Sequence, residues 1–195
     1  YIRIHRQRSA SRYDMLKSYY DGRHSILNRR KESYLSNNRI VCNHAKYIVD
    51  TLTGYMTGNP VVYTSKSDIS ILADMLKKAE SDTQDTDLAH SISIYGTGYE
   101  MAYMSSDETP CVKLANCEPQ NTFVVYDDTV EHKPVFAVYY FEVYDSNQNL
   151  KGYKCTMSTD SLLYEFFLGI GFDIQGEIAE NENIFGMVNI IEYYN

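Results

Sequence analysis

The sequence predicts an α+β protein in which N-terminal helices are followed by an antiparallel β-sheet. Two observations lead to this fold class. Before Gly96, apolar residues recur at steps of three and four, which is the period of an amphipathic helix. After Gly96, segments rich in Val, Tyr and Phe alternate with short turn sequences, which is typical of strands joined by hairpins. A helical half followed by a run of strands is an α+β arrangement.

The first expected helix spans residues 9–20 and carries Tyr13 and Leu16 on one face. Asp21 and Gly22 end it, because this pair favours a turn. Residues 22–38 are then expected to form a basic loop.

The clearest helix runs from Asn43 to Gly58, and six apolar residues form a stripe along it that we expect to be buried: Ala45, Ile48, Val49, Leu52, Tyr55 and Met56. Asn43 suits the N-cap, and Gly58 can adopt a left-handed C-terminal cap before Pro60 stops the helix. Gly54, inside the helix, predicts close approach of another backbone. Residues 61–63 (VVY) are expected to form a short strand.

Two more helices precede Gly96. Ser67 and Asp68 are expected to cap one whose apolar face holds Ile69, Leu72, Ala73 and Leu76. The other spans residues 85–95 and ends at Gly96. Six strands are then expected, at residues 99–104, 111–115, 122–126, 135–144, 153–157 and 188–193. Residues 106–110 and 127–128 read as turns, and residues 177–183 as a solvated acidic loop.

Charge is distributed unevenly along the 195 residues, whose formal net charge is −8. Residues 1–50 contain 11 of the 18 Lys and Arg but only 4 of the 26 Asp and Glu. A basic start on an acidic remainder suits contact with a polyanion or with an acidic neighbouring subunit, although a solvated helix face would look the same. The 19 Tyr and absent Trp weakly favour an interaction protein.

We find no sequence pattern for catalysis, for a metal or for a cofactor. Cys42 and His44 are two residues apart, a spacing that does not bring side chains together on a helix. The four cysteines show no Cys-x-x-Cys pair, so we expect free thiols in a reducing compartment. The lone Gly-x-Gly pairs at residues 96–98 and 169–171 do not continue into a phosphate-binding loop. No apolar run is long enough to span a membrane.

Several segments together resemble the portal proteins of tailed bacteriophages, of the siphophage type that infects Gram-positive hosts. The most specific are residues 20–26 (YDGRHSI), 37–39 (NNR), 43–50 (NHAKYIVD) and 54–60 (GYMTGNP). Residues 95–100 (YGTGYE) and 183–193 (NIFGMVNIIEY) add weaker support, and Asn189 stands where the pattern has Pro. The resemblance covers residues 13–195.

The resemblance implies a wing-like N-terminal fragment of a portal protein. It divides the chain into a mainly helical part, residues 1–96, and an antiparallel β part, residues 97–195, with the stem, clip and crown absent. It also implies a structural, non-enzymatic head–tail connector that forms a ring, commonly a dodecamer, through which DNA is packaged and ejected. The implied partners are other copies of the chain, the major capsid protein and scaffold, terminase, head-completion adaptors and double-stranded DNA. The implied location is the capsid vertex of the virion, and the host cytoplasm during assembly.

A basic cluster is the best candidate for a contact site, either with a neighbouring subunit or with DNA: Arg23, Arg29, Arg30, Lys31 and Arg39. Two functions of other classes remain open from the residues alone. One is a nucleic-acid-binding module that uses this basic N-terminal arm and stacks bases on Tyr13, Tyr19, Tyr20 and Tyr34. The other is a hydrolase whose site is dispersed along the chain.

Overall fold

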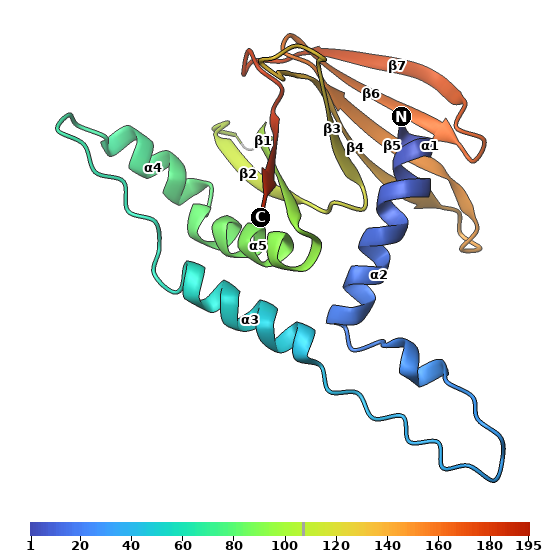
Figure 1. Ribbon diagram of the computed structural model, residues 1–195. Coiled ribbons are helices and arrows are strands. Elements are labelled where there is room, and N and C mark those ends of the chain that lie inside the picture. The colour runs from blue at the N-terminus through green and yellow to red at the C-terminus, as the bar shows by residue number, and fades with distance from the viewer. Residues whose placement is uncertain (107) are drawn as a thin grey trace.

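A run of helices leads into two antiparallel sheets in the computed structural model, which describes residues 1–106 and 108–195 (Figure 1). The helical segments are α1 (Ile2–His5), the π-helical η1 (Arg6–Ala10), α2 (Ser11–Tyr20), the 3-10 helix η2 (Ser25–Asn28), α3 (His44–Thr57), α4 (Ser70–Lys78) and α5 (Ser81–Tyr95). The strands are β1 (Thr97–Met104), β2 (Val112–Cys117), β3 (Thr122–Tyr126), β4 (Pro134–Tyr144), β5 (Leu150–Ser158), β6 (Leu162–Gly169), β7 (Ile174–Glu182) and β8 (Ile190–Tyr194). This order confirms the α+β prediction.

The strands form two sheets rather than the single sheet expected from the sequence. One has the order β2-β1-β8 and the other the order β3-β4-β5-β6-β7, and every pairing is antiparallel. β6 and β7 were not predicted, and the acidic loop expected at residues 177–183 was wrong. β7 pairs only with β6 and is exposed along its whole length, so glutamates on either face remain in water. The predicted turn at residues 106–110 includes residue 107, which lies outside the described residues.

The N-terminal helix begins earlier than predicted and is part of the core of the larger sheet. α1, η1 and α2 run as one rod from Ile2 to Tyr20 and lie beside the five-stranded sheet (Figure 1). Ile2 joins the buried cluster that contains Phe123, Val138 and Tyr140. Residues 2–5 alternate apolar and basic side chains and residues 6–8 are polar, so this segment has no helical apolar periodicity.

Arg6 and His5 attach this rod to the sheet by polar contacts. The Arg6 guanidinium lies 2.6 Å from the Glu142 carboxylate and over the ring of Tyr153. His5 Nδ1 lies 2.9 Å from the Tyr140 hydroxyl, and the imidazole is buried. Burial lowers the pKa of His5 to about 4, so the ring is neutral at pH 7.

Polar contacts join β8 and the residue before it to strands of both sheets. Glu192 accepts hydrogen bonds from the hydroxyls of Tyr99 and Tyr126, at 2.5 and 3.0 Å. The backbone N–H of Asn189 donates to Ser158 Oγ, and its side-chain amide donates to the Ala102 carbonyl. A proline at position 189, which the portal pattern has there, would have no N–H for the first of these bonds. The hydrogen bond to Ser158 is therefore possible only because this chain has Asn at that position.

Candidate subunit interface

α3 forms where the sequence predicts it, and its ends show which residues define it. Asn43 caps the helix, because its side-chain oxygen accepts from the Lys46 N–H at 3.1 Å while its amide donates to the Tyr20 carbonyl at 2.7 Å. Gly58 is right-handed, with φ −62°, so the predicted left-handed cap was wrong. A Cβ at Gly58 would lie 2.6 Å from the Gly54 carbonyl oxygen, which explains why a glycine suits this position.

The apolar stripe of α3 is mostly exposed, so the prediction of a buried stripe was wrong. Val49 is buried with Ile94 and Tyr95 of α5, whereas Tyr55 is 85% and Met56 59% exposed. Outside its own helix, Gly54 has no atom within 4 Å of where a Cβ would lie, so the expected close backbone is also absent from the described residues of this subunit. The helix therefore presents an apolar face with no cover.

Exposed apolar side chains also occur in the link after α3 and on α4. Residues 61–63 are extended but pair with no strand in the described part of the chain, so the predicted strand was wrong. Pro60 precedes them, in the place where it was expected to stop the helix. We call the combined surface the α3–α4 face; it consists of the exposed side chains of Ile48, Leu52, Tyr55, Met56, Val61, Val62, Tyr63, Ile71, Leu72 and Met75. A surface of this kind marks an interaction site.

A groove of about 510 Å³ runs along this face between residues 61–63, α4 and the start of α5. Val62, Leu72 and Leu76 are among its apolar lining residues, and Glu80 and Asp82 lie at its acidic end. We call it the α4 groove. The sequence contained a signal for this groove, because the apolar face of α4 was predicted, and Ile69, Leu72, Ala73 and Leu76 of that face line it.

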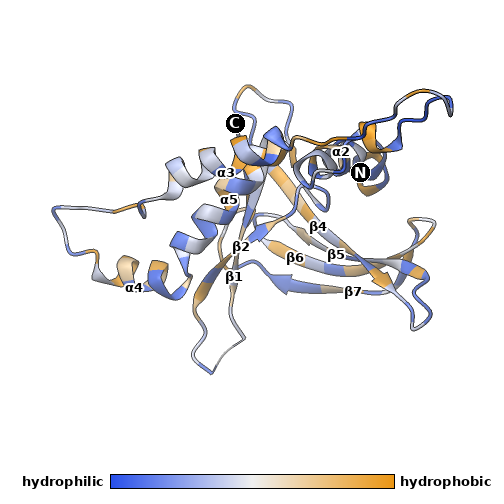
Figure 2. Cartoon of the chain, turned by 90° about the horizontal axis from the view of Figure 1, so that it is seen from below, coloured by the Kyte–Doolittle hydropathy of each residue, from blue (hydrophilic) through white to orange (hydrophobic). Residues whose placement is uncertain are grey.

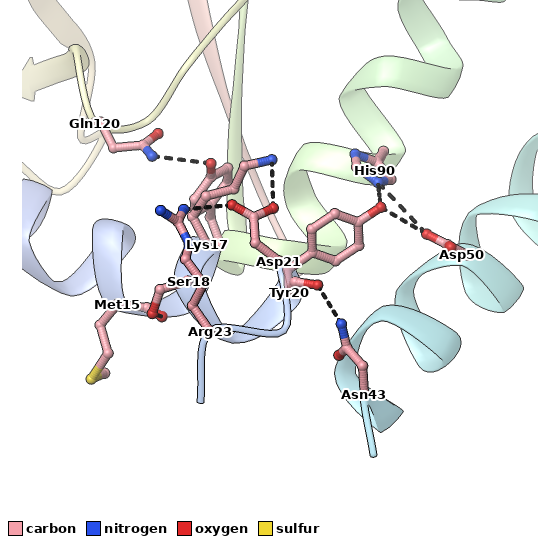
Figure 3. Close-up of polar contacts among 11 residues, drawn as sticks. Met15, Lys17, Ser18, Tyr20, Asp21, Arg23, Asn43, Asp50, His90 and Gln120 are labelled. Carbon is pink, nitrogen blue, oxygen red and sulfur yellow. Dashed lines mark hydrogen bonds and ion pairs between the residues drawn. The ribbon is translucent and has the colours of Figure 1, made fainter. Parts of the chain in front are cut away.

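A small set of polar contacts attaches α3 to the body of the protein (Figure 3). The Tyr20 hydroxyl donates to Asp50 Oδ1 of α3 at 2.9 Å and lies 2.9 Å from His90 Nε2 of α5. Burial, together with the neighbouring Asp50 carboxylate, raises the pKa of Tyr20 to about 12, so this hydroxyl keeps its proton. Tyr20 thereby links three helices at one point.

The predicted basic residues lie on one projecting loop, residues 23–39, that we call the basic arm. Arg23 pairs with Asp21 at 2.7 Å, and Arg39 donates to the Leu27 carbonyl at 3.0 Å. Lys31 donates to the Ser36 carbonyl at 2.9 Å, whereas the guanidinium groups of Arg29 and Arg30 have no hydrogen-bond or ion-pair partner within the described residues. Their charges are available to another molecule.

The basic arm and the α4 groove lie at opposite ends of the subunit. In Figure 1 the arm extends to the lower right, beyond α2, whereas α4 projects at the left. Figure 2, seen from below, shows the same separation, with hydrophobic segments on α4 at one end and the strongly hydrophilic arm at the other. In Figure 1, α3 lies between them.

The described residues hold no group of three or more His, Cys, Asp or Glu side chains that could bind a metal. They also include no helix that is both long and apolar enough to cross a membrane. Cys117 and Cys155 are buried, and burial raises the pKa of each thiol to about 12, which makes both poor nucleophiles. The exposed apolar face is therefore the feature with the clearest functional meaning.

Comparison of the sequence with protein-family models identifies the family of this chain. The family model described as "Phage portal protein, SPP1 Gp6-like" matches residues 1–195. The chain belongs to this family of phage portal proteins. Portal proteins are structural proteins of the capsid vertex that act in DNA packaging and virion assembly. A comparison with curated proteins gives no match.

Proposed function

We propose that this portal chain is one subunit of a closed ring at the capsid vertex, through which DNA enters and leaves the head. The exposed α3–α4 face carries the proposal, because a side of α3 that is apolar and uncovered in one subunit can be buried against another. In this role residues 1–96 supply contacts between subunits, and residues 97–195 form the β part of the wing. The ring acts as a conduit and an assembly platform rather than as an enzyme.

The same proposal extends to the partners of the ring. Terminase, the major capsid protein with its scaffold, and head-completion adaptors would each bind a surface of the assembled ring, and double-stranded DNA would pass through its channel. Assembly would take place in the host cytoplasm before the ring becomes part of the virion. The family match supports these contacts as a class, and the structure of one subunit supports the contact between copies most directly.

The experiment is to image the intact portal protein by negative-stain electron microscopy and to weigh its particles by mass photometry. Rings with a central channel are the expected result. Substituting Leu52→Asp and Val62→Asp places two carboxylates in the apolar α3–α4 face and should shift the protein to smaller species. The matched control is Val130→Asp, which changes an exposed valine outside this face. Monomers of the wild-type protein at every concentration tested would overturn the proposal.

A further inference from the structure

We propose that the basic arm of one subunit lies in the α4 groove of the next subunit. This pairing rests on the proposed ring and names the two surfaces that meet in it. The occupant of the groove is thus a second copy of this chain. The argument rests on apolar complementarity, charge complementarity and the positions of the two surfaces in the subunit.

The arm offers both apolar and basic side chains. Tyr34 in the arm is 81% exposed and Ile40, directly after the arm, is 73% exposed, so neither side chain is covered in its own subunit. Arg29 and Arg30 precede Tyr34 in the chain, and Arg39 adjoins Ile40. A projecting loop of this composition can place apolar side chains in a groove while its guanidinium groups reach acidic side chains at the rim.

The groove offers the complementary pattern. Its lining includes apolar side chains of α4 and of residues 61–63, and acidic residues gather where α5 begins. A second groove, of about 370 Å³, shares Val61, Asp82 and Thr83 with it and adds Asp85 and Asp87. Lys77 also lies on the rim, but the acidic side chains outnumber it.

The acidic side chains at the grooves lack a counter-charge in the subunit. Within the described residues, Glu80, Asp82, Asp85 and Asp87 make no ion pair. Burial raises the pKa of Asp85, and the neighbouring Asp82 carboxylate adds to this effect because it repels a second negative charge. Arginine side chains from another subunit would supply the missing positive charge beside these carboxylates.

The positions of the two surfaces decide between intramolecular and intermolecular contact. The arm and α4 project at opposite ends of the subunit in both views, so an arm does not occupy its own groove (Figures 1 and 2). Contact between two different surfaces of identical subunits is heterologous, and repeating it either closes a ring or extends a filament. The pairing therefore supplies the kind of contact that a ring requires.

A charge exchange in the intact portal protein tests the pairing. The arm variant is Arg29→Glu with Arg30→Glu, and the groove variant is Asp82→Lys with Asp87→Lys. Each double variant is expected to raise the subunit concentration needed for half-assembly by about tenfold. Combining the arm and groove variants in one chain should bring this concentration most of the way back to the wild-type value. Circular dichroism of each variant checks that the subunit remains folded.

The matched control reverses acidic residues on another exposed surface. Glu177→Lys with Glu180→Lys changes β7, an acidic edge strand outside the α4 groove, and is expected to leave assembly unchanged. Rescue of the arm variant by the β7 change instead of the groove change would overturn the pairing and place the arm on β7. Loss of short-duplex DNA binding by the arm variant, with assembly intact, would also overturn it and make DNA the partner.

Disulfide trapping tests the geometry directly. In a Cys42→Ser background, Leu35→Cys places a thiol on the arm and Leu72→Cys places one in the groove. Under oxidising conditions, the double variant is expected to give a ladder of linked species beyond the dimer, because each subunit contributes one arm and one groove. If wild-type rings form but no such ladder appears, the pairing is wrong and the ring proposal stands. If no rings form at all, the ring proposal itself fails.

Discussion

At the scale of single residues, the two glycines of the α3 region have opposite physical roles. Gly54 is exposed, and no atom outside its helix lies within 4 Å of a Cβ placed there. Gly58 follows the last turn, where a Cβ would lie 2.6 Å from the Gly54 carbonyl oxygen. The residue type is the same, but only the second position sterically excludes a side chain.

This contrast gives a matched pair of substitutions. Gly54→Ala is expected to stabilise the chain by up to about 1 kcal/mol, because alanine has the higher helix propensity and meets no obstacle. Gly58→Ala is expected to destabilise it, because the end of α3 must shift. Urea unfolding followed by circular dichroism measures both changes. Equal effects of the two substitutions would contradict this account. Gly54→Ala that stabilises the chain but prevents assembly would show that another subunit approaches α3 at Gly54.

At the scale of secondary-structure elements, α3 depends on a few contacts for its position. Tyr20→Phe removes the hydroxyl that donates to Asp50 and contacts His90, but keeps the ring. We expect the free energy of unfolding to fall by about 1 kcal/mol. Amide hydrogen exchange should become several-fold faster in α3 and change little in the sheets. Hydrogen exchange followed by mass spectrometry measures this directly. Tyr19→Phe is the control, since Tyr19 is exposed and lies on the same turn of α2. Uniform acceleration across the whole chain would argue against a local role for Tyr20.

The helices show what sequence periodicity can and cannot predict. The cap at Asn43 and the left-handed Gly96 that ends α5 follow from local chemistry, so their positions were predictable. The period of α3 predicted a helix with one apolar side, but it carries no information on what covers that side. Ile48 and Leu52 were therefore expected to be buried and are exposed.

The strands were also predicted only where the local sequence carries a clear pattern. β3 was predicted with its observed bounds, because Val, Phe and Tyr cluster between turn residues. β7 was missed because an edge strand exposed on both faces needs no apolar alternation, and its glutamates resemble a loop. The division into two sheets depends on pairing between β1 and β8, which lie about 90 residues apart in sequence. Such long-range pairing leaves no local signal.

At the scale of the whole molecule, the contact between the N-terminal rod and the larger sheet makes stability depend on pH through His5. In the folded chain the pKa of His5 is lowered from 6.5 to about 4 by burial. As pH falls below 6.5, the unfolded chain binds a proton at this residue before the folded chain does, so the free energy of unfolding decreases. The contribution is complete above pH 6.5 and is lost by pH 4.

His5→Gln should therefore flatten the decline in stability between pH 6.5 and 4, by at most about 3 kcal/mol at pH 4. The slope with pH is the quantity to compare, because the substitution also changes the packing against Phe123 and Tyr140 at every pH. Urea unfolding at half-unit steps of pH gives this slope. His132→Gln, at an exposed histidine in the turn before β4, should leave the slope unchanged. If His5→Gln and the wild type lose stability in parallel on acidification, the rod is not attached to the sheet through a neutral, buried His5.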